Sequence, residues 1–189
     1  MEPDLTYEPD FLDQASALRY QDTLTRTIPW EQHQVRLFGK WIDTPRRSAW
    51  FGDPGVRYGY SGQVYDPHPW TAEVAQLRAA VESASGARFN SVLLNLYRTG
   101  QDSMGWHADD EAELGERPVI ASLSLGATRR MRFRLKENHR VTHAVDLASG
   151  SLLIMGPDVQ AAWQHALPKT KRVSQPRINL TFRLVGPRG

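Results

Sequence analysis

Alternation of apolar and polar residues from about residue 89 onward constrains the fold of this chain more than any other feature. A period of two is typical of strands that bury one face. Gly, Pro, Asn or Asp generally separates the runs, as expected for turns between short strands. Seven such strands at close spacing predict an antiparallel double sheet or a jelly roll. The predicted strands are 90–97, 119–125, 130–135, 143–147, 151–155, 163–167 and 177–185.

Two segments ahead of these strands have the spacing of amphipathic helices instead. Residues 10–27 begin at Asp10, which is a good helix N-cap, and residues 70–83 begin at Thr71. The predicted apolar stripes consist of Phe11, Leu12, Ala15, Leu18 and Leu24 in the first helix, and of Val74, Leu77 and Val81 in the second.

The stretch between the two helices, residues 38–69, is rich in Gly, Pro and aromatic residues. That composition predicts turns and short strands, with no room for long helices. With 189 residues and no internal repeat or linker, the chain is predicted to be one α+β domain over 1–189. Its helices precede a C-terminal β core.

The chain contains no cysteine, which excludes disulfides, thiolate metal sites, iron–sulfur clusters and cysteine nucleophiles. Any metal must therefore bind His, Asp, Glu or backbone oxygen. No apolar run approaches the ~20 residues of a membrane-spanning helix, so we expect no membrane partner. The N-terminus also lacks the basic start and apolar stretch of a secretory signal. We expect a monomer that is cytoplasmic in a bacterium, or nuclear in a eukaryote.

Charged residues are strongly segregated, although the formal net charge is only +2. Residues 101–116 hold six acids and no Lys or Arg, whereas residues 117–140 hold seven Lys or Arg and one Glu. Residues 169–189 hold six basic residues and no acid. Such blocks are usually solvated surface. A basic face beside an acidic pocket would nevertheless suit an anionic ligand with a polar reacting group.

His107 and Asp109 are an informative pair, because residues i and i+2 of an extended segment point the same way. They can offer an imidazole and a carboxylate to one point, and His165 is the best candidate for a third ligand. Two His and one carboxylate leave three positions open on an iron(II) ion. Taken alone, such a pair is more commonly solvent-facing or a hydrogen-bonded strand terminus.

The last predicted strand supports the metal hypothesis. In an extended segment its polar residues share one face and its apolar residues share the other. Two arginines, an Asn and a Thr are costly to bury without an anion. A guanidinium binds a carboxylate bidentately, so this face suits a dicarboxylate held next to the metal, and the alternative is an edge strand whose polar side faces water. The polar residues are Arg177, Asn179, Thr181 and Arg183, and the apolar ones are Ile178, Leu180 and Phe182.

Four motifs occur in order along the chain: Asn95-Leu-Tyr97, His107-Ala-Asp109, His165, and an Arg-x-Asn-x-x-x-Arg strand that ends at Arg183. Together they resemble the AlkB family of iron(II)/2-oxoglutarate dioxygenases, most closely its DNA-repair members. The likeness covers about residues 38–185, and the arginine strand is more selective for this family than the metal triad. The resemblance implies a double-stranded β-helix (jelly roll) catalytic core at 88–186. N-terminal helices and a nucleotide-recognition lid would occupy 1–87.

The resemblance also implies a role for each matched residue. Arg183 would form the salt bridge to the far carboxylate of 2-oxoglutarate, and Arg177 would lie near the end that chelates the metal. This cosubstrate would take two open metal positions and leave one for O2, with ascorbate as the reductant in vitro. The implied catalytic iron ligands are His107, Asp109 and His165, and the implied cosubstrate-binding residues are Asn95, Tyr97, Arg177, Asn179 and Arg183.

On the substrate side, the resemblance implies a methylated base that is flipped out of its strand, because a stacked base is unreachable. Glu111 would accept hydrogen bonds from the exocyclic amine, and an acidic pocket favours a base that methylation has made cationic. Aromatic residues of the lid could stack on that base, although most aromatics of the chain must be core. Phe38 is either a wedge that fills the gap or part of a hydrophobic hairpin. The stacking candidates are Tyr58 first, then Trp50, Phe51 and Tyr60, and the phosphate-contact candidates are Lys40, Arg46, Arg47, 129–134 and 169–172.

The sequence therefore predicts an oxidative demethylase that repairs 1-methyladenine and 3-methylcytosine in alkylated DNA. Hydroxylation of the N-methyl group would release formaldehyde, with succinate and CO2 as coproducts. An RNA demethylase with the same site is hardly distinguishable by sequence. A protein or small-molecule hydroxylase is a third hypothesis, which the match of residues 38–60 disfavours. A binding module without turnover would be supported by loss of a triad or arginine residue, and none is lost.

Overall fold

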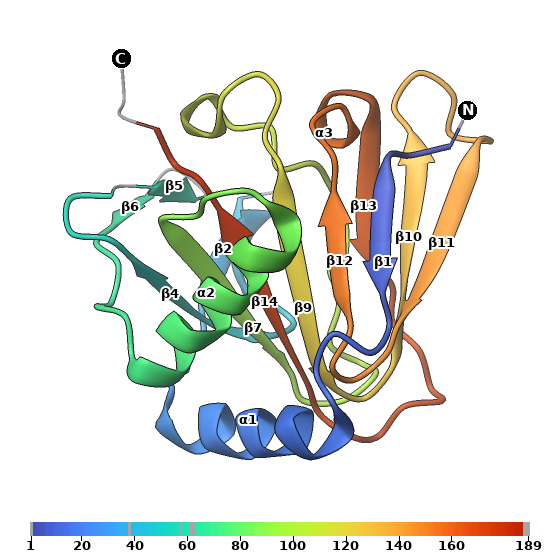
Figure 1. The fold of residues 1–189 in the computed structure, drawn as a ribbon. Coiled ribbons are helices and arrows are strands. Elements are labelled where there is room, and N and C mark those ends of the chain that lie inside the picture. The colour runs from blue at the N-terminus through green and yellow to red at the C-terminus, as the bar shows by residue number, and fades with distance from the viewer. Residues whose placement is uncertain (1, 38, 57, 61–62, 187–189) are drawn as a thin grey trace.

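The computed structural model contains each of the seven predicted strands, and all of its strand ladders are antiparallel (Figure 1). The structure describes residues 2–186 except 38, 57, 61 and 62, with the backbone alone at 36–37, 58–60 and 63–65. A large sheet has the order β1 (Leu5–Glu8), β12 (Leu152–Met155), β9 (Ile120–Gly126), β14 (Arg177–Arg183), β7 (Ser91–Tyr97) and β4 (Arg47–Gly52). A small sheet has the order β11 (Thr142–Leu147), β10 (Arg129–Leu135), β13 (Trp163–Leu167) and β8 (Met104–His107).

Two core clusters hold these layers together. One lies between the large sheet and the helices α1 (Gln14–Thr27) and α2 (Ala72–Ser85), which pack on its outer face (Figure 1). The other lies between the two sheets and includes Phe133, Leu153 and Trp163. Burying a large apolar side chain stabilises a protein by roughly 1.5–3 kcal/mol, so these clusters fix the sheets face to face. The result is an α+β fold built on antiparallel sheets.

Strand β14 lies at the centre of the large sheet, paired with β7 on one side and β9 on the other. All seven of its residues are buried. Ile178, Leu180 and Phe182 pack into the core under the helices. The polar residues of the strand face the small sheet instead, where they line a cavity. The predicted division of β14 into two faces is confirmed, and the alternative of a solvated edge strand is wrong.

Helix α1 begins later than predicted, at Gln14, because Asp13 rather than Asp10 caps it. The Asp13 carboxylate accepts a hydrogen bond from the backbone N–H of Ser16 at 2.8 Å, which satisfies an N–H group that the helix itself leaves unpaired. The buried residues of the helix are Ala17 and Leu24. Leu18, which was predicted in the apolar stripe, is 57% exposed.

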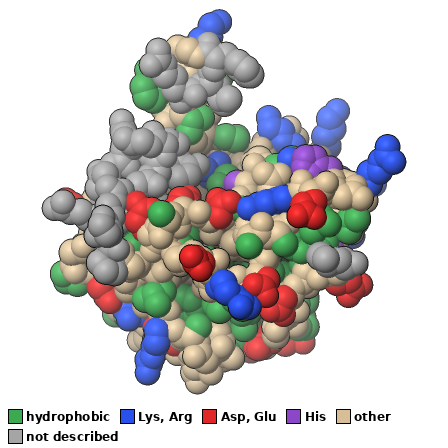
Figure 2. All heavy atoms as spheres, turned by 90° about the horizontal axis from the view of Figure 1, so that it is seen from above, with side chains coloured by type: hydrophobic (Ala, Val, Ile, Leu, Met, Phe, Trp, Pro, Cys, Tyr) green, Lys and Arg blue, Asp and Glu red, His purple; other side chains and the backbone are tan. Residues whose placement is uncertain are grey.

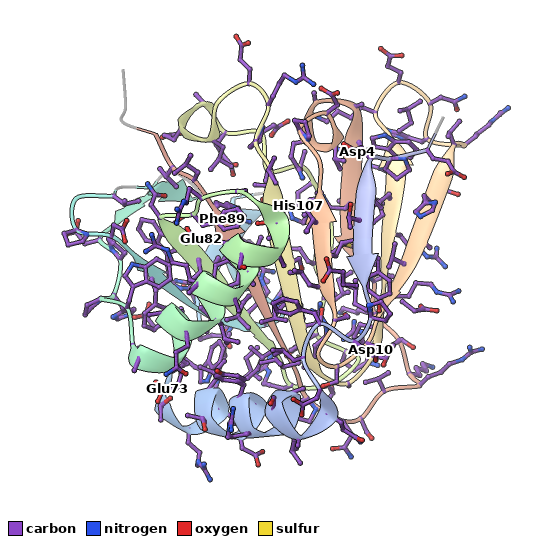
Figure 3. The ribbon with its side chains drawn as sticks, in the orientation of Figure 1. Asp4, Asp10, Glu73, Glu82, Phe89 and His107 are labelled. Atoms are coloured by element: carbon purple, nitrogen blue, oxygen red, sulfur yellow. The ribbon has the colours of Figure 1, made fainter. Side chains whose placement is uncertain are left out.

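Helix α2 begins after Thr71 as predicted, with the Thr71 hydroxyl accepting from the N–H of Val74. Its three predicted core residues are buried. At its other end Gly86 adopts a left-handed conformation with φ 67°, which favours glycine. The Glu82 side chain accepts a hydrogen bond from the N–H of Phe89 and thereby ties α2 to the segment before β7 (Figure 3).

The stretch between the helices forms short strands, as predicted. One hairpin consists of β2 (Gln34–Leu37) and β3 (Lys40–Asp43), and the other of β5 (Tyr58–Tyr60) and β6 (Gln63–Tyr65). Phe38 lies outside the described residues, so neither prediction for it is tested. Two shorter elements complete the fold, a 3-10 turn at Ala112–Leu114 and α3 (Val159–Ala162). Within the described ranges, no helix is long and apolar enough to cross a bilayer.

The two candidate caps of α1 give opposite predictions for stability. Asp13→Ala removes the acceptor for the Ser16 N–H and should lower the urea midpoint of unfolding. Asp10→Ala is the matched control, because Asp10 lies in a turn ahead of the helix (Figure 3) and should leave the midpoint unchanged. Equal effects of the two variants would contradict the assignment of Asp13 as the cap.

Candidate active site

The pairing of β8 with β13 brings two of the predicted metal ligands together. His107 lies directly opposite His165 in this antiparallel ladder, and their ring centroids are 4.2 Å apart. Side chains that are directly opposite in such a ladder point to the same face of the sheet. His165 is buried, whereas His107 is partly exposed. The Nδ1 atom of His107 lies 2.9 Å from the carbonyl oxygen of Gly105, and if Nδ1 donates there, the lone pair on Nε2 is left for a ligand.

Asp109 completes the predicted triad from the loop just after β8 and is 3% exposed. Its Oδ1 atom accepts a hydrogen bond from Nη2 of Arg183 at 2.7 Å, which joins this loop to the end of β14. Its backbone N–H donates to Oε1 of Gln160 at 2.9 Å. The other carboxylate oxygen, Oδ2, is buried and has no hydrogen-bond partner among the described residues. Both the backbone and one oxygen of Asp109 are therefore held, and the second oxygen remains for another ligand.

The electrostatics of this cluster favour the protonation states that bind a cation. Burial alone would raise the pKa of Asp109, but Arg183, His165 and His107 together lower it to about 2. Burial, reinforced by the neighbouring His107, lowers the pKa of His165 to about 3. At neutral pH the site therefore presents an ionised carboxylate and a neutral imidazole, the forms in which these groups coordinate metals.

Strands β7 and β14 bring the predicted cosubstrate residues together by their register. Asn95 pairs with Asn179, and Tyr97 pairs with Arg177, so all four side chains share one face. The Arg177 guanidinium lies 5.4 Å from the centre of the Tyr97 ring and donates to Oγ of Ser124 at 2.9 Å. Burial lowers the pKa of Arg177 to about 10, which leaves it cationic at neutral pH. It is thus a buried positive charge with a neutral hydroxyl and an aromatic ring beside it.

The two arginines of β14 lie at opposite ends of this site, in the reverse of the predicted order. Arg183 bonds to Asp109, so its guanidinium lies at the metal end. Arg177 comes six residues earlier on the same face, next to Tyr97 and Ser124. The assignment of Arg183 to the far carboxylate of the cosubstrate is therefore wrong, because the carboxylate that it contacts belongs to a predicted metal ligand.

All eight predicted metal and cosubstrate residues line one cavity of about 30 Å³ between the two sheets. Its buried polar atoms without a hydrogen-bond partner among the described residues include Oδ2 of Asp109, Nδ1 of His165 and Nε of Arg177. Such atoms are unfavourable unless a ligand meets them. A cation would satisfy the carboxylate oxygen, and an anion would satisfy the guanidinium.

The donor set fits iron(II) in kind, since two imidazoles and a carboxylate are the ligands of many non-haem iron oxygenases. In the positions shown, no three His, Asp or Glu side chains of the described residues form a group that could hold a metal ion.

The acidic residues that follow Asp109 point in different directions. Asp110 is exposed and pairs with Lys136 at 2.8 Å. Glu111 lies just before the 3-10 turn, and its Oε2 atom is buried without a partner among the described residues. Strand β8 ends at His107, so alternation along a strand does not set the direction of Glu111. Its predicted contact with the substrate base stays a prediction.

The predicted stacking residues are separated by the structure. Trp50 is half-buried and lines a second cavity next to the first. Phe51 is 1% exposed and lies in the core under the helices, where its ring is 5.3 Å from that of His68. The prediction that Phe51 stacks on a base is therefore wrong, because β4 turns it to the opposite face from Trp50. The side chains of Tyr58 and Tyr60 are outside what the structure describes.

Two predicted phosphate contacts are buried and cannot reach a nucleic acid backbone. Arg46 is 5% exposed, and its Nε atom donates to Oδ1 of Asn95 at 3.1 Å. Arg129 is 2% exposed and donates to the carbonyl oxygens of Thr99, Asp102 and Pro168. The remaining basic candidates are mostly exposed, and Lys and Arg side chains gather at one side of the face in Figure 2. The exposed candidates are Lys40, Arg47, Arg130, Arg132, Lys169, Lys171 and Arg172.

Sequence reasoning missed Gln160, a fully buried residue of α3. Its side chain accepts from the backbone of Asp109 through Oε1, and its Nε2 atom lies 3.4 Å from Sδ of Met155. No sequence motif marks Gln160 within Val159–Ala162. Its role becomes visible only in the structure, where α3 lies next to the loop after β8.

The chain is similar in sequence to known proteins. A model of the 2OG-Fe(II) oxygenase superfamily matches residues 4–183. The alpha-ketoglutarate-dependent dioxygenase alkB homolog 3 of Bos taurus is 41% identical over 95% of this chain and 65% of its own length. The DNA oxidative demethylase ALKBH2 of Mus musculus is 44% identical over 82% of this chain and 67% of its own length. The chain thus spans about two thirds of the length of these relatives.

Two solved structures share the fold at low sequence identity. The structure of OsALKBH1 superimposes with a TM-score of 0.68 at 18% identity, covering 97% of this chain and 98% of that one. A prolyl-4-hydroxylase from Pseudomonas putida superimposes with a TM-score of 0.62 at 17% identity, covering 99% of this chain and 94% of that one.

The role of Gln160 can be tested through stability. Gln160→Ala leaves the N–H of Asp109 buried and unpaired, which should cost about 1–3 kcal/mol in the free energy of unfolding. Gln101→Ala is the control, because Gln101 is exposed and should change stability by less than about 0.5 kcal/mol. Urea denaturation of both variants measures the difference. A loss at position 160 no larger than at position 101 would remove the proposed support of Asp109.

Proposed function

This chain belongs to the AlkB family of the 2OG-Fe(II) oxygenase superfamily, and on that basis we propose that it is an oxidative demethylase of N-alkylated bases in DNA. Its substrates are 1-methyladenine and 3-methylcytosine. The observation that carries the proposal is the pairing of His107 with His165 beside the buried Asp109, opposite the polar face of β14. A relative at 44% identity is named a DNA oxidative demethylase, which favours DNA over RNA.

Iron(II) would be held by His107, Asp109 and His165. Arg183 fixes Oδ1 of Asp109 and leaves Oδ2 for the ion. The neutral state of His165 supports the same role, because only an unprotonated imidazole nitrogen coordinates a metal. When bound, iron(II) and 2-oxoglutarate supply, with O2, the oxidation that turns the N-methyl group into an unstable hydroxymethyl group, which leaves as formaldehyde.

The cosubstrate 2-oxoglutarate would lie along the shared face of β7 and β14. Arg177 would pair with its far carboxylate, which supplies the anion that this buried guanidinium needs. Asn95, Tyr97 and Asn179 surround the path between Arg177 and the metal end, and they would hydrogen-bond along it. Succinate and CO2 are the expected coproducts.

The architecture fits the same assignment. The two facing sheets correspond to a double-stranded β-helix, or jelly roll, which would be the catalytic core at 88–186. Residues 1–87 would carry the helices and a nucleotide-recognition lid formed by the β2–β3 and β5–β6 hairpins. The exposed Trp41 and Ile42 of β3 support this role, because apolar side chains on a projecting hairpin are unfavourable in water.

The alkylated base would be flipped out of its strand and bound beneath this lid. Glu111 would contact its exocyclic amine, and the buried oxygen without a partner among the described residues supports that contact. Trp50 would stack on the ring, together with Tyr58 or Tyr60 if their side chains point inward. The exposed arginines of β10, Arg130 and Arg132, would contact phosphates irrespective of sequence.

Turnover should depend on iron(II), 2-oxoglutarate and the triad. Purified protein with ascorbate should release formaldehyde from oligonucleotides that carry 1-methyladenine or 3-methylcytosine. His107→Ala or Asp109→Ala should abolish this release while circular dichroism stays close to wild type. The assay is run on single- and double-stranded DNA and RNA, so that preferred turnover of RNA would redirect the proposal to that substrate. No turnover on any of the four would reject it.

The two arginines of β14 should have separable effects. Arg177→Gln should raise the apparent KM for 2-oxoglutarate at least about tenfold, because charged hydrogen bonds contribute about 1.5–3 kcal/mol. Arg183→Gln should instead weaken metal binding, measured by titration with Mn2+ in place of iron(II), because it frees the carboxylate that it orients. If Arg183→Gln raises the KM for 2-oxoglutarate more than Arg177→Gln does, Arg183 and not Arg177 pairs with the far carboxylate.

A further inference from the structure

Arg129, the first residue of β10, is a buried cation to which neither the metal site nor the cosubstrate site assigns a role. It is 2% exposed. Its Nη1 atom donates to the carbonyl oxygen of Thr99 at 3.2 Å, and its Nη2 atom donates to those of Asp102 and Pro168 at 2.9 and 2.8 Å. Hydrogen bonds from a charged donor are stronger than neutral ones. The guanidinium therefore holds two segments at once, the loop between β7 and β8 and the chain just after β13.

These two segments flank one end of the first cavity. The β7–β8 loop, residues 98–103, begins directly after Tyr97 and ends directly before Met104. Leu167 is the last residue of β13 and directly precedes Pro168. Tyr97, Met104 and Leu167 all line the first cavity. The carbonyl groups that Arg129 binds are thus one or two residues away from three side chains of the cavity wall.

The two segments also contact each other closely. The N–H of Gly100 donates to the carbonyl oxygen of Val173 at 2.8 Å, and the N–H of Thr170 donates to that of Gly100 at 2.8 Å. A Cβ atom on Gly100 would overlap the carbonyl oxygens of Thr170 and Val173, so only glycine permits this approach. The backbone bonds and the guanidinium of Arg129 together fix the two segments to one another.

The charge of Arg129 lies close to that of Arg177. Their guanidinium carbons are 5.9 and 5.4 Å from the centre of the same Tyr97 ring. The Asp102 carboxylate is bonded to Arg98 through both oxygens, at 2.7 and 2.8 Å. Burial is the main cause that lowers the pKa of Arg177, and repulsion from Arg129 lowers this pKa further. An anion that pairs with Arg177 is therefore attracted by two positive charges.

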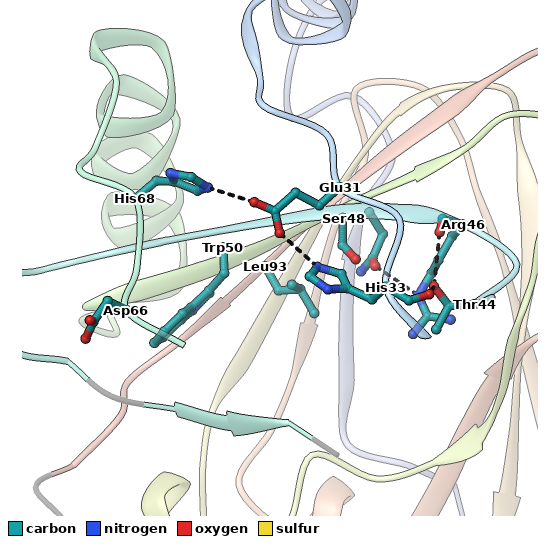
Figure 4. A pocket seen from close by; sticks show the side chains of 10 residues that line it. Glu31, His33, Thr44, Arg46, Ser48, Trp50, Asp66, His68 and Leu93 are labelled. Carbon is teal, nitrogen blue, oxygen red and sulfur yellow. Dashed lines mark hydrogen bonds and ion pairs between the residues drawn. The ribbon is translucent and has the colours of Figure 1, made fainter. Parts of the chain in front are cut away.

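Arg46 is also buried beside the site but makes a different kind of contact. It lines the second cavity, next to Trp50 (Figure 4), and its Nε atom donates to Oδ1 of Asn95. Arg129 is not among the described residues that line either cavity. Its hydrogen bonds go to backbone carbonyl groups, so it acts on a ligand through its neighbours and its charge, and not by touching the ligand.

We propose that Arg129 is a positioning residue for the dicarboxylate cosubstrate. Its hydrogen bonds hold the strand ends that place Tyr97 and Arg177, and its charge adds to that of Arg177 where the far carboxylate would bind. The inference rests on the proposed location of 2-oxoglutarate along β7 and β14. It does not depend on which methylated base is the substrate.

The test compares two ligands that differ in the far carboxylate. 2-Oxopentanoate has the same carbon chain as 2-oxoglutarate but carries a methyl group in place of that carboxylate. Binding of each to Mn2+-loaded protein without O2 is measured by isothermal titration calorimetry, so the readout does not depend on turnover. Wild type should prefer 2-oxoglutarate, and Arg129→Gln should lower this preference roughly fivefold, because one of the two charges is lost. The ratio of two affinities on one protein does not change with the fraction that is folded.

Two matched variants complete the comparison. Arg129→Lys keeps the charge and should retain most of the preference. Arg140→Gln removes an exposed positive charge from the turn after β10 and should leave the preference unchanged. If Arg129→Gln weakens both ligands equally, or changes neither, the proposal is overturned and Arg129 is only a support of the two segments.

The same role can be tested without a variant, which covers the case in which Arg129→Gln does not fold. A ligand stabilises the structure that positions it by the same free energy, because coupling is reciprocal. Binding of 2-oxoglutarate to wild-type Mn2+-loaded protein should therefore slow hydrogen exchange of the amides in 98–103 and 168–173, and 2-oxopentanoate should slow it less. Equal exchange with and without 2-oxoglutarate would overturn the proposal. Failure of the proposed function looks different, since formaldehyde release from methylated oligonucleotides would be absent while 2-oxoglutarate still binds.

Discussion

A polar face buried at the centre of the large sheet is the constraint on which the rest of this structure depends. β14 lies between β7 and β9, so Arg177 and Arg183 are enclosed by neighbouring strands. Burying a guanidinium group costs free energy unless an anion pairs with it. Asp109 pairs with Arg183, whereas Arg177 contacts the Tyr97 ring and the Ser124 hydroxyl. A dicarboxylate beside Arg177, as proposed for the cosubstrate, would supply the second anion.

The bond between Asp109 and Arg183 also joins the two sheets at the site. Asp109 follows β8 of the small sheet, and Arg183 ends β14 of the large one. A buried ion pair adds little net stability, because desolvation of both charges offsets their attraction. Its value here lies in orientation: one oxygen is taken by Arg183, the backbone is held by Gln160, and Oδ2 is left for a cation.

Local pattern in the sequence was enough to predict β14 and its two faces, because alternation depends only on neighbouring residues. The pairing of His107 with His165 was not predictable in this way, since the register of two strands 58 residues apart depends on packing. Trp50 and Phe51 illustrate the same limit. Both faces of β4 are covered, so the sequence could not tell the core residue from the one that lines the cavity. The prediction of which arginine lies at the metal end failed for a related reason. Alternation places Arg177 and Arg183 on one face of β14, but which of them lies near Asp109 depends on how the other strands pack.

Asn95 connects the two cavities physically. It lines both of them, and its side-chain oxygen accepts the hydrogen bond from Arg46. Any ligand in the first cavity that draws the Asn95 amide toward itself must therefore compete with Arg46, which lines the second. Because the interior is closely packed, such a shift is transmitted to the neighbouring wall and not absorbed. A cosubstrate bound in the first cavity, as proposed, would therefore act on the wall of the cavity next to Trp50 through this one hydrogen bond.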